Sequence, residues 1–145
     1  MWNWLFGSKE LPQQQQQPAD YVSGNFRASY DIAEELWKFQ LAGIPFGVRG
    51  TGKEFDLREL EWAENTARLI QTIRPDIEAK VDEQLSGWFG ACDPAAKRIN
   101  LVTRLNYPDG KDRTLVNYTG DKSWGDYVAT VVILDLKVID SYGSN

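Results

Sequence analysis

The run DYVATVVIL, from Asp126 to Leu134, limits the possible folds of this chain more than any other stretch. In an extended strand, successive side chains point to opposite faces. One face carries Tyr127, Ala129, Val131 and Ile133, and the other carries Val128, Val132 and Leu134. Because both faces are apolar, the run predicts a strand inside a sheet. Such a strand is covered on both sides, or by helices on one side and a partner on the other.

The loop DKSWGD, directly before this strand, has two interpretations. Gly125 permits a positive φ and Asp126 can hydrogen-bond nearby backbone, which favours a tight turn that leads into the buried strand. Alternatively, the loop presents Trp124 to a partner between Asp121 and Asp126, because a rigid aromatic ring among polar groups is a common interface anchor. Trp124, Asp121 and Asp126 are therefore candidate partner-binding residues.

Two consecutive helices are predicted in the middle of the chain. Asp56 is an N-cap candidate with Glu59 three residues later, and good helix formers follow up to residue 74. Pro75 is expected to end this helix and to serve as the first residue of a second one, over residues 75–89. In that second helix, apolar residues recur at helical spacing. They are Ile77, Val81, Leu85, Trp88 and Phe89.

The remaining runs are β-like. Three aromatic-rich runs precede the helices, at residues 21–30, 36–43 and 44–52. Four follow them: a hairpin of residues 98–107 and 113–120 around the turn PDGKD, then the run 126–134, then a short strand at 137–143. This order predicts an α+β fold, an antiparallel β-sheet with a two-helix pair packed on one face.

Residues 1–20 differ in composition from the rest. The apolar start MWNWLF is followed by a Pro-bounded glutamine tract with nothing to bury, so this part is expected to be an apolar segment and a Gln/Pro-rich linker. Residues 21–145 are expected to form a single α+β domain. The start lacks the pattern of a secretory signal, and Cys92 is the one cysteine, so the expected location is the cytoplasm.

The sequence contains no histidine. This removes the usual general base near neutral pH, the Ser-His and Cys-His nucleophile pairs, and the commonest metal ligand. We therefore expect no catalytic residues, no metal site and no cofactor, and a protein that is not an enzyme. A reserve hypothesis is an enzyme that uses carboxylates, which would need a deep pocket with two converging acids of shifted pKa.

Charge is distributed unevenly along the chain. Residues 53–83 carry nine acids and five bases, whereas residues 97–113 carry five bases and two acids. With a net charge of −5, the chain is a poor candidate for binding nucleic acid. An acidic helical face, including Glu61 and Glu64, is better suited to steering toward a basic protein.

Four stretches together carry a resemblance: MWNWLFGSKE, LWKFQLAGIPFGVRG, DLRELEWAENTARLI and SWGDYVATVVI. Their layout resembles a family of small bacterial α+β domains of unknown function, some of which are similar to immunity proteins of toxin systems. The resemblance implies a non-enzymatic intracellular protein-binding domain that inhibits a partner toxin, through its acidic helical face or the Trp124 loop. An alternative hypothesis is a membrane-associated accessory protein held at a bilayer by Trp2, Trp4 and Phe6. The oligomeric state does not follow from the sequence.

Overall fold

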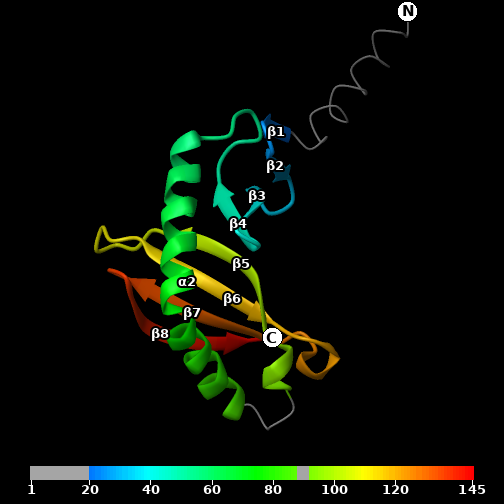
Figure 1. The fold of residues 1–145 in the computed structure, drawn as a ribbon, viewed down its shortest axis with the longest axis vertical. Helices are drawn as coiled ribbons and strands as arrows, with labels where there is room; N and C mark the ends of the chain where they lie inside the picture. The colour runs from blue at the N-terminus through cyan, green and yellow to red at the C-terminus, as the bar shows by residue number, and fades with distance from the viewer. Residues whose placement is uncertain (1–19, 88–91) are drawn as a thin grey trace, which may run out of the picture.

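The computed structural model describes residues 20–87 and 92–145, and it shows one sheet with one long helix against it (Figure 1). The sheet has eight strands, which lie in sequence order from β1 to β8. The strands are β1 (Asp20–Ser23), β2 (Phe26–Asp31), β3 (Leu36–Leu41), β4 (Ile44–Arg49), β5 (Arg98–Leu105), β6 (Arg113–Thr119), β7 (Val128–Leu134) and β8 (Lys137–Ser144). The helix is α2 (Leu57–Ser86), and two short 3₁₀ turns are η1 (Pro94–Ala96) and η2 (Lys122–Trp124).

The sheet consists of two antiparallel four-stranded meanders, β1–β4 and β5–β8. They meet at a parallel pair of strands, β4 and β5, in which Phe46 lies opposite Val102. The fold is therefore α+β with a predominantly antiparallel sheet. The first predicted run, residues 21–30, is in fact a hairpin of two strands, because Gly24 adopts a φ of 59° and turns the chain between them.

The predicted two-helix pair is wrong: α2 is one helix of 30 residues with Pro75 inside it. Proline removes one backbone hydrogen bond and kinks a helix, but it need not end one where other contacts hold the next turn. Here Arg74 Nε donates to Glu78 Oε2 at 2.8 Å across the proline turn, and Tyr118 Oη donates to the same carboxylate at 3.0 Å. Pro75 itself is exposed, so its ring meets no neighbouring strand.

An apolar stripe that is continuous on both sides of Pro75 gives the physical reason for the single helix. Ile70 and Ile77 are both fully buried, one before the proline and one after it. The stripe faces both meanders: the Trp62 ring packs edge-on against Phe46 of β4 at 5.7 Å, and Gln84 reaches Ser141 of β8. An α-helix of this length extends about 45 Å. In Figure 1 the helix runs along the front of the sheet from one meander to the other.

The core lies between α2 and the sheet and differs in composition from end to end. Beside β1–β4 it is aromatic, and the Phe55 ring packs against four other rings at centroid distances of 5.3–5.7 Å. Those four rings belong to Tyr21, Phe26, Trp37 and Phe39. Beside β5–β8 the fully buried residues are mostly aliphatic, with Val102, Val116 and Val131 facing the helix. Both ends belong to one continuous core.

Strand β7 confirms the expectation of an interior strand, because it pairs with β6 on one side and β8 on the other. Its Ala129, Val131 and Ile133 belong to the core under α2. On the opposite face Thr130 and Val132 are also buried, and Thr130 Oγ1 donates to Asn117 Oδ1 at 2.7 Å. Among the residues that the structure describes, no α-helix covers this second face. Within the same ranges, no helix is long and apolar enough to cross a membrane.

Replacing Pro75 by alanine tests the continuity of α2. In a helix interior, alanine restores the missing hydrogen bond, so we expect a gain of about 1 to 2 kcal/mol in the free energy of unfolding, measured by urea denaturation. If Pro75 instead began a second helix, Pro75→Ala would lower stability slightly, because a proline at that position costs nothing and restricts the unfolded chain. Pro94→Ala, at the first residue of η1, is the control and should bring no gain.

Val131→Asp should prevent folding, because Val131 is fully buried in the core under α2, where a carboxylate would lose its hydration. Far-UV circular dichroism and thermal denaturation provide the measurement. Val22→Asp is the matched control on β1, where the side chain is 60% exposed, and should change stability by less than about 0.5 kcal/mol. A cooperatively folded Val131→Asp protein would contradict the assignment of β7 to the core.

Candidate functional site

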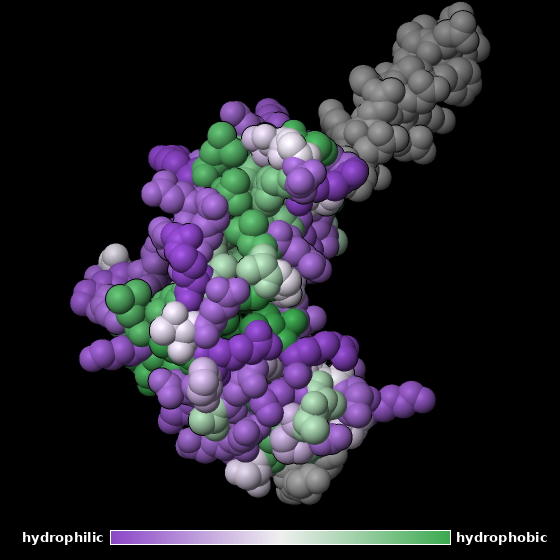
Figure 2. Space-filling view, in the orientation of Figure 1, coloured by the Kyte–Doolittle hydropathy of each residue, from purple (hydrophilic) through white to green (hydrophobic). Residues whose placement is uncertain are grey.

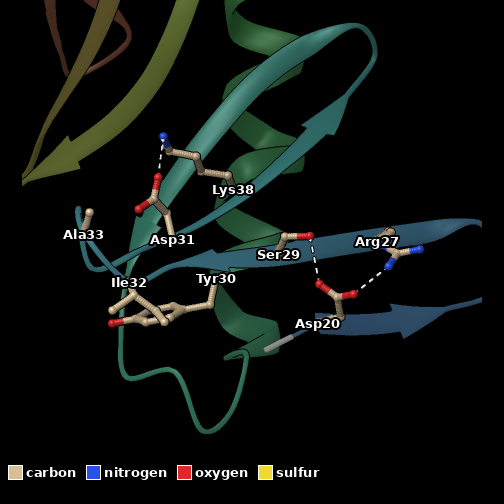
Figure 3. Close-up of a pocket in the computed structure, with 8 residues that line it drawn as sticks. All are labelled: Asp20, Arg27, Ser29, Tyr30, Asp31, Ile32, Ala33 and Lys38. Atoms are coloured by element: carbon tan, nitrogen blue, oxygen red, sulfur yellow. Dashed lines mark hydrogen bonds and ion pairs between the residues drawn. The ribbon is translucent and has the colours of Figure 1, made fainter. Parts of the chain in front are cut away.

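The hollow shown in Figure 3 lies on strands β1–β3 and the β2–β3 turn, and has a volume of about 720 Å³. Polar and charged side chains dominate its lining. They come from β1 (Asp20), β2 (Arg27, Ser29, Tyr30, Asp31), the turn (Ile32, Ala33) and β3 (Lys38). Strand register brings these residues together: Asp20 lies opposite Ser29, and Ser29 lies opposite Lys38.

The charges of this hollow are paired with one another. Arg27 Nη2 lies 2.5 Å from Asp20 Oδ2, and Ser29 Oγ donates to Asp20 Oδ1 at 3.0 Å (Figure 3). Lys38 Nζ lies 3.1 Å from Asp31 Oδ2 and 2.7 Å from Glu34 Oε1. The hydrogen bond from Arg27 holds the pKa of Asp20 below its usual range, and the backbone N–H of Glu34 does the same for Asp31. Acids with lowered pKa values are poor proton carriers near neutral pH.

The buried ionisable groups have structural roles. Burial raises the pKa of the Tyr118 hydroxyl, which donates to Glu78 and helps to hold the turn that follows Pro75. Burial likewise raises the pKa of the Cys92 thiol, so less of it is the nucleophilic thiolate at a given pH. Within residues 20–87 and 92–145, no three His, Cys, Asp or Glu side chains gather as a metal site would require.

The structure places Trp124 in the core, with 3% of its surface exposed. Its Nε1 donates to the backbone oxygen of Asp93 at 2.8 Å, and the neighbouring Ser123 Oγ accepts from the Asp93 N–H at 2.8 Å. A Cβ atom on Gly120 would stand 2.2 Å from Trp124 Nε1, so only glycine leaves room for the ring. The loop thus fastens the segment after α2 to the sheet. A buried ring offers no surface to a partner in this conformation.

The two acids of the loop remain at the surface. Asp121 accepts hydrogen bonds from the N–H and hydroxyl of Ser123 at 2.9 and 2.6 Å, which lower its pKa and shape the η2 turn. Gly125 has a φ of 55°, as the positive-φ expectation required. Asp126 is exposed, and the described residues provide it with no ion pair.

Glu61 and Glu64 lie on the solvent side of α2, in its first three turns. The η2 loop lies at the other end of the molecule, close to where α2 ends (Figure 1). The five candidate partner-binding residues therefore form two separate groups. Glu61 and Glu64 form one group on α2, and the three residues of the η2 loop form the other. Trp2, Trp4 and Phe6 lie outside the described residues, and so does the linker.

Sequence reasoning did not find the hollow on β1–β3. Its residues lie between positions 20 and 38, and the pairing register of three strands brings Asp20, Ser29 and Lys38 side by side. One local signal of this surface is present in the stretch DYVSGNFRASYD, where the polar residues Asp20, Ser29 and Asp31 stand next to tyrosines. That pattern indicates one solvated face of a sheet, but it does not indicate which cross-strand pairs form.

No family model, no curated protein and no solved structure matches this chain. The resemblance to immunity proteins and the expected cytoplasmic location therefore stay predictions.

Trp124→Ala separates a core role from a surface role. Truncating this buried ring should lower the free energy of unfolding by about 3 kcal/mol or more, measured by chemical denaturation. Lys122→Ala is the matched control, because it alters an exposed side chain in the same short turn. An unchanged stability of the Trp124→Ala variant would contradict the packing described here.

Proposed function

We propose that this chain is a non-catalytic protein-binding domain whose partner is a basic protein. The exposed face of α2 around Glu61 and Glu64 is the proposed contact surface. The observation that carries the proposal is that these two carboxylates are exposed, one turn apart, and without an ion pair among the described residues.

Three other acids on α2 differ from Glu61 and Glu64, because each has a cation as its partner. Glu59 pairs with Arg104 at 2.5 Å, Glu78 with Arg74 at 2.8 Å, and Asp82 with Lys97 at 3.1 Å. The cation nearest in sequence to Glu64 on the same face, Arg68, donates instead to the side-chain oxygen of Asn65. Within the described residues, therefore, no cation competes with an incoming partner for Glu61 and Glu64.

Physical chemistry favours a basic partner for such a surface. Exposed charges of one sign accelerate encounter with a surface of the opposite sign and select against partners of like charge. The overall charge of −5 adds to the same attraction. Because salt screens exposed charges over about 8 Å at physiological ionic strength, the binding should weaken as salt rises.

The chemistry of the described residues supports a binding role over a catalytic one. The hollow on β1–β3 has its acids tied to Arg27 and Lys38, and the lowered pKa values of Asp20 and Asp31 do not suit acid–base work. The carboxylate enzyme held in reserve needs two converging acids with pKa values shifted toward neutrality. In this hollow the shifts run in the opposite direction.

A toxin-inhibiting immunity protein is the specific form of this proposal that the sequence layout favours, with a basic toxin as the partner. The membrane-associated alternative depends on Trp2, Trp4 and Phe6. Since these residues lie outside the described ranges, nothing in the fold adds to it. It stays a prediction, to be tested by deleting residues 1–17 and measuring membrane association.

Charge reversal on the two candidate surfaces tests the proposal. The tagged chain is used to capture proteins from a lysate of its source at low and high salt, beside the variants Glu61→Lys/Glu64→Lys and Asp126→Lys. We expect one stoichiometric basic partner, released by salt and bound at least about tenfold more weakly by the helix variant, a loss of about 1.4 kcal/mol. Asp126→Lys, an exposed reversal at the other end of the molecule, should bind normally.

The results for the two variants show whether the partner binds at the outer face of α2 or at the η2 loop. Loss of binding in Asp126→Lys alone would move the contact to the η2 loop. A partner whose binding does not depend on salt or on either reversal would reject an electrostatic contact altogether.

A further inference from the structure

A second hollow, of about 420 Å³, lies between α2 and the tip of the β7–β8 hairpin. Helix residues form one side and hairpin residues the other, with apolar side chains beside charged ones. The lining residues are Ile73, Asp76, Ala79, Lys80 and Glu83 from α2, and Leu136, Lys137 and Val138 from the hairpin. Figure 2 shows apolar surface at the left of the molecule, beside the helix and over the end of this hairpin.

Leu136 is the most exposed large apolar residue in the described ranges, at 71%. It occupies a two-residue turn together with Asp135, and their φ values are 67° and 50°. Turns of this kind favour Asn-Gly or Asp-Gly, because a bulky side chain is strained at positive φ. The hairpin therefore holds a leucine in a strained conformation and presents it to solvent, which brings the isolated chain no benefit.

The hollow also contains an unpaired acid and an unpaired base. Asp76 on α2 and Lys137 on β8 both line it, and neither makes an ion pair with any described residue. Lys80 and Glu83, in contrast, lie 3.5 Å apart. A surface that contains one free charge of each sign is complementary to a copy of itself turned by a two-fold rotation.

Strand β8 forms the edge of the sheet beside this hollow. At its far end Gln84 Nε2 donates to the Ser141 backbone oxygen at 3.2 Å, so α2 covers that part of the edge. Between Lys137 and Asp140 the outer edge has no partner strand among the described residues. There Ile139 is 48% exposed, beside the irregularity in the β7–β8 register. An open apolar edge is a surface that proteins usually cover.

We propose that a second copy of this chain docks on this surface, as a two-fold symmetric dimer. Leu136 of each copy enters the hollow of the other, and Asp76 of each copy faces Lys137 of its partner. The dimer also covers Ile139 and the open segment of β8.

This dimer goes beyond the proposed function and leaves its surface free. Asp76 lies twelve residues after Glu64, about 18 Å further along the helix axis. The two proposals therefore fail or succeed independently.

The test is the mass of the full-length chain in solution, measured by analytical ultracentrifugation over a concentration series. The dimer should be present at about 100 µM and should dissociate on dilution. Leu136→Asn replaces the strained leucine by a residue that tolerates positive φ, and it removes the apolar anchor. We expect it to be a monomer at the same concentration, with a melting temperature equal to or above that of the unaltered chain at matched low concentration. Leu57→Asn, at another exposed leucine (57%), is the control and should remain a dimer.

A charge swap tests the orientation. Asp76→Lys and Lys137→Glu should each weaken the dimer at least tenfold, because each places like charges opposite one another. The double variant should restore most of the affinity, since the two charges then attract again with their signs exchanged.

Three results would overturn the dimer. The first is a monomer at every concentration. The second is a dimer that Leu136→Asn leaves intact. The third is a dimer that disappears on deletion of residues 1–17. That result would mean that the apolar start of the chain, and not Leu136, is what binds in the hollow. Failure of the double variant to recover would overturn the pairing of Asp76 with Lys137.

Discussion

The rest of the structure depends on one contact layer, the apolar stripe of α2 against both halves of the sheet. The two meanders meet at β4 and β5, where Phe46 opposite Val102 is the paired position, so the strand ladder alone joins them weakly. The helix adds contacts that connect the two meanders, because its Trp62 packs on β4 and its later turns contact β6 and β8. A helix broken at Pro75 would not bind the halves together in this way.

The position of the helix also determines which surfaces remain available. It covers one face of the sheet and presents its own outer side to solvent, where Glu61 and Glu64 have no ion pair within the described residues. It also forms one wall of the hollow at the β7–β8 hairpin. The binding surfaces proposed here therefore both follow from the packing of α2, although they lie at different points along it. The ion-paired hollow lies on β1–β3 and the β2–β3 turn, and it is better explained as a solvated sheet face.

Much of the fold was predictable because local chemistry specifies it. Asp56 caps the helix as expected, through a 2.9 Å hydrogen bond from the Arg58 N–H. The PDGKD turn joins β5 to β6, and the apolar run at residues 126–134 forms an interior strand. The predicted pair of helices is wrong because Pro75 lies inside one continuous helix and does not end it. Only the strands that pack against both halves of the helix, and the bond from Tyr118 to Glu78, show why the helix continues.

The sequence alone determined the α+β class of the domain, the start of the helix, the positions of most strands along the chain and the lack of histidine chemistry. These properties depend on residue type and on neighbours within a few positions. Tertiary structure alone decided that Trp124 is buried against Gly120 and Asp93, and that Asp76 and Lys137 line one hollow. It also decided that Glu61 and Glu64 have no ion-pair partner within residues 20–87 and 92–145. Each of these depends on contacts between residues distant in the chain, and the pattern of a single sequence does not encode strand register or side-chain pairing directly.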